Sequence, residues 1–170
     1  MFGCDPLMMG AVDVQTYRYL RLVWPDSAGW AGDVGLANVL FYVNSATYPP
    51  IMTSNTAPAP YAASAASYYE EFWGTYPPFC AFAGGTNEYV ARGNGAGYLQ
   101  LDFGAGRGIS PDRVDLRPRA NGSGPASPLT LYGATDGGPL VSVASFVFES
   151  WTAGVTKSFA TGLPGVFTTV

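Results

Sequence analysis

The sequence predicts an all-β fold, an antiparallel sandwich that follows a short N-terminal arm. The 170 residues include 22 glycines and 14 prolines, which break the chain into short segments joined by turns. Aromatic residues make up 15% of the chain, and they favour strands. Charged residues reach only 12%, about half the usual share, and the composition excludes a coiled coil, which would be rich in glutamate, lysine and leucine. With 48% apolar residues, the chain has enough material for the core of one domain.

Alternation of apolar and polar residues indicates where the strands lie. Residues 17–24 alternate between two faces, as expected for a half-buried strand. Further strands are predicted at 98–103, 113–119, 129–132, 140–151 (with a bulge), 156–160 and 166–170. The core is predicted to include Leu20, Leu22, Leu40, Leu99, Leu101, Leu131 and Phe146. Strands at this spacing indicate a sandwich or jelly roll.

The remaining segments give the expected boundaries. Residues 1–16 show no regular period and are predicted to be an arm, followed by a domain over 17–162 and a C-terminal strand or tail over 163–170. Residues 34–43 are almost continuously apolar, which predicts a strand buried on both faces. Residues 44–67 are rich in proline, alanine and serine and are predicted to form a long loop with one or two short edge strands.

Charge and residue types exclude several classes of function. Eight basic residues against twelve acidic ones give a net charge of -4, which is unsuited to binding nucleic acid. Lys157 is the only lysine, and the absence of histidine excludes triads that need an imidazole and removes the commonest metal ligand. No apolar run approaches the length of a membrane span, and the N-terminus has no pattern of an export signal. We therefore expect a protein made in the cytosol, with no contact with membranes.

Patterns that occur in enzymes have structural explanations here. The glycine-rich runs 93–97 and 104–108 do not lead into helices, so we expect turns and not phosphate loops. Glu70 and Glu71 are adjacent, so on a strand they would point to opposite faces and could not form a catalytic pair by themselves. Asp102 and Asp136 stand at predicted strand ends and turns, where carboxylates usually accept hydrogen bonds from backbone amides. No enzymatic activity is expected.

The two cysteines, Cys4 and Cys80, are far apart in the sequence. We expect two free thiols, one in the arm and one in the core. A disulfide between them stays an alternative, because sequence does not show the geometry that it needs.

The segment from residue 68 to residue 82 contains seven aromatic side chains, and Pro77 and Pro78 interrupt it. Seven rings cannot all point into one core, so some are expected to form, with loop 44–67, a surface that contacts a partner protein or stacks on sugar rings. The alternative is that they are core and loop-packing residues. The predicted contact residues are Tyr69, Phe72, Trp73, Tyr76 and Phe79.

Five motifs in this order are similar to the discoidin-like (coagulation factor 5/8 C-type) domains, versions of which occur in tailed-phage virion and tail proteins. They are residues 17–22 (YRYLRL), 35–42 (GLANVLFY), 97–104 (GYLQLDFG), 127–137 (SPLTLYGATDG) and 151–159 (WTAGVTKSF). The resemblance implies a galactose-binding-like jelly roll of two antiparallel sheets, which binds glycans, lipids or proteins and does not catalyse a reaction.

The sequence departs from the family at its structural calcium site. Ala83 stands where the family commonly has an aspartate, and Asn38 stands where it has a glutamate. Since Ca²⁺ is bound by oxygen ligands, often carboxylates, we expect no tightly bound calcium, no other metal and no cofactor.

The resemblance favours a structural protein of a tailed-phage particle, assembled in the host cytoplasm and attached to the capsid or tail in repeated copies. The alternative is a carbohydrate-binding adhesion module that contacts host glycans. In either case we expect the arm to dock on other virion proteins, since apolar side chains without a period have no obvious place in a sandwich. The arm residues concerned are Phe2, Leu7, Met8 and Met9.

Overall fold

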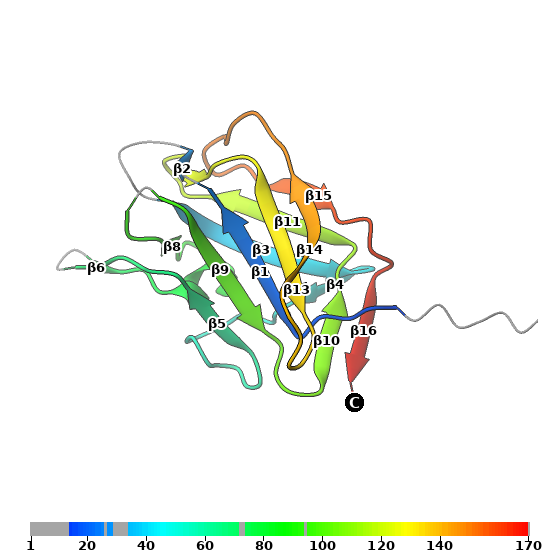
Figure 1. Cartoon of the computed structure of the whole chain (residues 1–170). Helices are drawn as coiled ribbons and strands as arrows, with labels where there is room; N and C mark the ends of the chain where they lie inside the picture. The colour runs from blue at the N-terminus through cyan, green and yellow to red at the C-terminus, as the bar shows by residue number, and fades with distance from the viewer. Residues whose placement is uncertain (1–13, 26, 29–33, 72–73, 94, 170) are drawn as a thin grey trace, which may run out of the picture.

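The computed structural model describes residues 14–25, 27–28, 34–71, 74–93 and 95–169. Two antiparallel sheets face each other and enclose one apolar core (Figure 1). One sheet has the order β14-β13-β1-β9-β5, and the other has the order β15-β11-β3-β4, with β8 also paired to β3. No α-helix occurs among the described residues, so the predicted all-β class is confirmed, and the arrangement is consistent with a β-sandwich.

The first sheet is built around β1 (Tyr19–Trp24), and Leu20, Leu22 and Trp24 point into the core. The predicted alternation of this strand is therefore confirmed. Its other strands are β9 (Gly97–Asp102), β13 (Leu129–Ala134), β5 (Ala62–Ala65) and β14 (Val141–Phe146).

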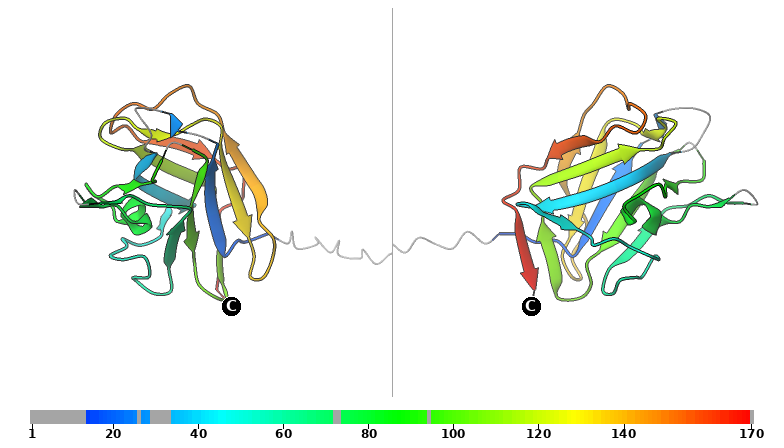
Figure 2. Two further views of the ribbon diagram at one scale, coloured as in Figure 1. Left: turned by 60° about the vertical axis from the view of Figure 1, so that its left-hand side comes forward. Right: turned by 180° about the vertical axis from the view of Figure 1, so that it is seen from behind.

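The second sheet is built around β3 (Gly35–Val43), which pairs with β11 (Arg113–Pro118). Figure 2 shows this sheet from behind. Its edge strands are β15 (Lys157–Ala160) and β4 (Ala46–Tyr48), and the two residues of β8 (Tyr89–Val90) pair with the start of β3. The loop predicted over 44–67 thus contributes β4 to one sheet and β5 to the other, as expected.

The prediction that residues 34–43 are buried on both faces is wrong for most of the strand. From Asn38 onward only alternate residues are buried, and Leu40 is half-buried on the outer face, where it pairs with Asp115. Leu40 is therefore not a core residue. Tyr42 also lies on this face, and the guanidinium of Arg113 stacks 3.6 Å from its ring centroid. Apolar side chains on the outer face made the run look continuous in the sequence.

Smaller sheets close the remaining parts of the domain. The C-terminal strand β16 (Val166–Thr169) pairs with β10 (Arg107–Ser110), and β12 (Gly124–Pro125) pairs with β2 (Ser27–Ala28). Tyr17 forms a bridge with Ile109, so the start of the domain lies beside β10. Residues 163–170 therefore contribute a strand to the domain.

The core combines aliphatic side chains from both sheets with a cluster of aromatic rings around Phe103. Phe41, Tyr48 and Tyr61 contact the Phe103 ring with centroid distances of 6.4, 6.4 and 5.8 Å. Gly133 leaves room for the Tyr17 ring, because a Cβ at this position would lie 2.4 Å from the ring. A larger residue would thus displace the ring that covers this end of the core.

Strand β14 is shorter than predicted. Its pairing with β13 contains a bulge, since Leu131 pairs with Ala144 but Tyr132 pairs with Ser142. After Phe146 the chain leaves the sheet, and the Trp151 indole donates a hydrogen bond of 2.7 Å to the Pro125 carbonyl. The bulge that the sequence predicted is present, but residues 147–151 are not part of the strand.

Replacing Leu101 by alanine tests the core. Leu101 is fully buried, so we expect Leu101→Ala to lower the free energy of unfolding by about 2–5 kcal/mol, measured by urea denaturation. Leu40→Ala is the control, because the half-buried side chain on the outer face should cost only about 1 kcal/mol. Equal losses at the two positions would contradict the outward orientation of Leu40.

Candidate functional site

The fold divides the aromatic residues that were predicted to form a contact surface. Tyr69, Tyr76 and Phe79 are all half-buried. The two tyrosines flank a short hairpin, whereas Phe79 lies in the 3₁₀ helix η2 (Pro78–Phe82). Phe72 and Trp73 lie outside the described residues. The predicted arm residues also lie outside them, namely Phe2, Leu7, Met8 and Met9.

The hairpin consists of β6 (Glu70–Glu71) and β7 (Gly74–Thr75), and it extends away from the sandwich (Figure 1). The Tyr76 amide donates a hydrogen bond of 3.0 Å to the Tyr69 carbonyl, which closes the base of the hairpin. The rings of these two tyrosines are tilted at 58°, with centroids 6.2 Å apart. The structure thus brings together two of the five predicted contact residues in one projecting element.

The base of the hairpin is anchored to β8. The Tyr69 amide donates to the Val90 carbonyl (2.8 Å), and the Val90 amide donates to the Tyr76 carbonyl (3.3 Å). Below them, the buried Tyr89 hydroxyl donates a hydrogen bond of 3.0 Å to the Ser67 carbonyl. These bonds hold the two tyrosine backbones in place relative to the second sheet.

Arg119 lies beside the hairpin. Its Nε donates to Glu88 Oε2 at 2.9 Å, and its guanidinium is 5.9 Å from the centroid of the Tyr76 ring. The aliphatic part of Arg119 crosses Gly35 so closely that a Cβ there would lie 2.1 Å from the arginine Cδ. Gly35 therefore permits the position of Arg119, because any side chain at residue 35 would push the arginine away.

A shallow hollow of about 230 Å³ adjoins this ion pair, and Glu88 is part of its wall. Arg117 also lines it and donates a hydrogen bond of 2.5 Å to the Gly85 carbonyl. The rest of the lining consists of Ala37, Gly85, Thr86, Pro118, Ala120 and Gly154. The Glu88–Arg119 pair connects the hollow to the hairpin, because Glu88 lines the hollow and Arg119 lies beside Tyr76. Together the two features form one surface with both charged and aromatic groups.

The second half of the aromatic segment is packed in the core. Cys80 and Phe82 of η2 are buried, and Phe79 packs against the core. The alternative that these aromatics are core and loop-packing residues therefore applies to Phe82 and also to Phe79, although Phe79 was predicted to be a contact residue. The change occurs at Pro77–Pro78, where the chain passes from the hairpin into η2.

Loop 44–67 contacts the same segment. Asn55 Oδ1 accepts a hydrogen bond from the Phe79 amide (3.0 Å), and the Met52 amide donates to the Phe82 carbonyl (3.1 Å). Ile51, next to Met52, is 67% exposed, and Tyr68, before the hairpin, is 38% exposed. Apolar groups at the surface are thus contributed by both segments.

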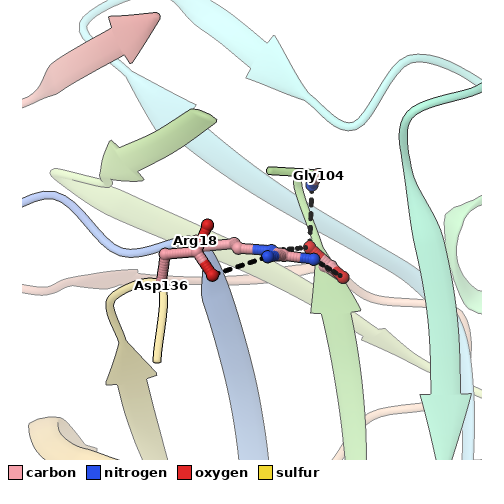
Figure 3. Close-up of polar contacts among 4 residues, drawn as sticks. Arg18, Gly104 and Asp136 are labelled. Carbon is pink, nitrogen blue, oxygen red and sulfur yellow. Dashed lines mark hydrogen bonds and ion pairs between the residues drawn. The ribbon is translucent and has the colours of Figure 1, made fainter. Parts of the chain in front are cut away.

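A second polar cluster lies on the first sheet, where Arg18 binds two carboxylates (Figure 3). Its Nε and Nη2 donate to the two Asp102 oxygens at 2.9 and 3.0 Å, and its Nη1 donates to Asp136 Oδ1 at 2.7 Å. Asp102 Oδ1 also accepts a hydrogen bond from the Gly104 amide (2.7 Å), as predicted for a strand-end carboxylate. Asp102, followed by Asp136, raises the pKa of Arg18 above its usual value.

This cluster has a structural role. Arg18 satisfies three donors within the protein and joins β1, the end of β9 and the turn that follows β13. Both carboxylate oxygens of Asp102 accept hydrogen bonds from Arg18, and one of them also accepts from the Gly104 amide. The cluster therefore stabilises the end of the first sheet and leaves little capacity for a ligand.

Reactive groups are few in the described part of the chain. No group of three or more metal-ligating side chains occurs there. The Cys80 thiol is free, and burial raises its pKa, so the protonated and unreactive form is favoured at neutral pH. The described residues of the glycine-rich runs 93–97 and 104–108 lead into strands β9 and β10 and open no helix, as expected.

No family model, no curated protein and no solved structure matches the chain. Among the described residues, no helix has the length and apolar character needed to cross a membrane.

Sequence reasoning missed Glu88, Arg117 and Arg119. The two arginines were interpreted only as the polar positions of an alternating strand, and Glu88 carried no motif. Their proximity depends on the pairing of β3 with both β8 and β11. The one local signal was the glycine at position 35, which indicates a close approach of another group.

Removing the charge of Asp102 tests the Arg18 cluster. Its carboxylate is 20% exposed and binds the guanidinium with both oxygens, so Asp102→Asn should lower the free energy of unfolding by about 1–2 kcal/mol. Asp136→Asn is the control, since the side chain is 59% exposed and the pair should contribute only about 0–1 kcal/mol. Urea denaturation at low and high salt measures both, and a larger loss for Asp136→Asn would contradict this order.

Tyr89 makes the stability depend on pH in the alkaline range. Burial raises its pKa above the ordinary value of about 10, so the folded state favours the neutral phenol. The neutral Tyr89 side chain therefore contributes its full stabilisation below pH 10. This contribution is lost as the pH rises further, because the Tyr89 hydroxyl ionises readily only in the unfolded chain. At pH 8, Tyr89→Phe should be less stable than the wild type, because the variant lacks the hydroxyl that donates to the Ser67 carbonyl.

The difference between the two proteins should then shrink between pH 10 and pH 11 in urea denaturation. A constant difference over this range would show that Tyr89 titrates normally in the folded protein.

Proposed function

We propose that this protein is a non-enzymatic structural component of a tailed-phage particle, attached to the capsid or tail surface through protein–protein contacts. We further propose that its sandwich is a jelly roll of the galactose-binding-like class. The similarity of five strand motifs to discoidin-like domains supports the phage context, and the two facing antiparallel sheets are compatible with this class.

The observation that carries the proposal is the projecting hairpin with a tyrosine at each side of its base. Tyrosine suits interfaces because its ring is apolar and its hydroxyl is polar. Together with the exposed Tyr68, which precedes β6, the hairpin presents apolar area that a partner can bury, and Ile51 exposes further apolar area on loop 44–67. Burial stabilises by about 1.5–3 kcal/mol for each large side chain, so two or three of them suffice for attachment in a repeated assembly.

The shape of the surface also favours a macromolecular partner. The hollow beside Glu88, at about 230 Å³, is smaller than the roughly 300–1,000 Å³ of typical small-molecule sites. Its two charged side chains already have partners, since Glu88 accepts a hydrogen bond from Arg119 and Arg117 donates one to the Gly85 carbonyl. A large partner that covers both the hairpin and the hollow fits this surface better than a small substrate.

A carbohydrate-binding module that contacts host glycans is the second candidate. It is favoured by the position of Tyr76 next to the Glu88–Arg119 pair. The Tyr76 ring can pack on a sugar, and Arg119, whose Nε is bound to Glu88, has further guanidinium donors for the sugar hydroxyls.

Incorporation into particles tests the proposal. Particles purified from cells that produce this chain should contain it, as detected by mass spectrometry and by immunogold labelling of the particle surface. Tyr76→Ala should reduce the number of copies per particle at least tenfold, because it removes a ring from the contact surface. Tyr132→Ala is the matched control, since Tyr132 is also half-buried but lies on β13 of the other sheet.

Different outcomes separate the two candidates. Absence of the chain from purified particles, or equal incorporation of both variants, would contradict the attachment proposal. Binding of the isolated protein to a glycan array, reduced by Tyr76→Ala but not by Tyr132→Ala, would establish the carbohydrate-binding function.

A further inference from the structure

Strand β14 forms an edge of the first sheet, since it pairs with β13 on one side only. Natural proteins usually protect such edges with charged residues, prolines or very short strands. No charged residue occurs between Asp136 and Glu149, so the six residues of β14 and their neighbours in the sequence lack a charged side chain.

The other edge strands of the two main sheets have such protection. Lys157 is the first residue of β15, and β4 has only three residues and is followed directly by Pro49 and Pro50. The four residues of β5 adjoin η2, which packs against this strand. β14 carries a bulge, which is itself a protective feature, but it is the longest of these four edge strands and contains no charged residue.

Exposed apolar side chains gather around the same edge. Seven large apolar residues are exposed in the part of the chain that the structure describes, and three of them lie on β14 or directly beside it in the chain. These are Leu140, Val141 and Val147, with exposed fractions of 38%, 45% and 80%. This concentration indicates an interface.

The sequence of β14 is complementary to itself in the antiparallel direction. It reads Val-Ser-Val-Ala-Ser-Phe, so two antiparallel copies centred on the bond between Val143 and Ala144 place apolar residues opposite apolar residues. In this register Ser142 of one copy faces Ser145 of the other, and Val141 faces Phe146. Serine pairs and apolar pairs are both favourable across strands.

The bulge in β14 makes this register possible. In a regular strand, residues an odd number apart point to opposite faces, so Ser142 and Ser145 could not face each other on one side of a sheet. The bulge adds one residue between Ser142 and Ala144. Ser142 and Ser145 thus pair with Tyr132 and Thr130, both on the outer face of β13, and therefore share one face.

We propose that β14 is a homodimer interface, in which two copies of this chain pair antiparallel about a two-fold axis between Val143 and Ala144. The two five-stranded sheets then form one continuous sheet, and the apolar residues near the edges are buried. A second copy fits better than an unrelated strand because the faces, the side-chain types and the absence of charge all match under the two-fold operation. The inference does not depend on the function proposed above.

The oligomeric state of the full chain provides the test. Multi-angle light scattering should give a dimer at 100 µM, with dissociation on dilution. The double variant S142K/S145K should be monomeric, with a dissociation constant raised at least tenfold, because two ammonium groups then face each other on either side of the axis. S64K is the control, since Ser64 is an exposed serine on β5, the opposite edge of the same sheet. The S64K variant should dimerise with the dissociation constant of the wild type.

A charge-swap experiment distinguishes loss of the interface from misfolding of the variants. S142E/S145E should be monomeric alone, and mixing it with S142K/S145K should restore a dimer that contains one chain of each kind, as mass spectrometry under native conditions measures. A monomeric wild type at 100 µM would overturn the proposal. So would dimers of S142K/S145K, or folded lysine and glutamate variants that do not associate when mixed.

Discussion

The register of β1 between β9 and β13 is the constraint on which the rest of the structure depends. Leu20 lies opposite Leu101 and Gly133, and Leu22 lies opposite Leu99 and Leu131. A slip of one residue would turn the inner face of β1 toward solvent and bring Tyr19 and Arg21 into the core, so the burial of these leucines selects one pairing. The same pairing determines which polar side chains meet on the outside. It places Arg21 opposite Gln100, to which it donates a hydrogen bond of 2.8 Å, and it brings Arg18 to Asp102.

The second sheet depends on β3 in a similar way, and the first residues of β3 determine how the surface groups near the hairpin are arranged. Gly35 and Leu36 pair with β8, which carries the hairpin, whereas the residues from Leu36 to Tyr42 pair with β11. Because Gly35 has no side chain, Arg119 can cross the strand and reach Glu88. One short stretch of β3 therefore joins the hairpin, the hollow and the ion pair between them.

Much of the fold could be predicted because alternation reports directly which face of a strand is buried. This was sufficient for β1, β9, β11 and β13, whose outer faces carry polar or amphipathic residues. Alternation failed for β3, where Leu40 and Tyr42 lie on the outer face and Tyr42 is covered by Arg113, and for the end of β14, where Phe148 and Trp151 pack together outside the sheet. The hairpin could not be predicted because its strands of two residues show no period. Glu88, Arg117 and Arg119 come together only through long-range pairing.

The order of the first sheet separates the two proposed surfaces. β14 and β5 are its opposite edges, and with a spacing of about 4.8 Å between neighbouring strands they lie roughly 19 Å apart. The hairpin is on the same side of the sandwich as β5, as Figure 1 shows, so pairing through β14 leaves it uncovered. A dimer formed at β14 would then carry one hairpin at each end and could bind two partners at once. Since the second contact of such a dimer is intramolecular, even a weak hairpin contact would give strong attachment to a repeated surface.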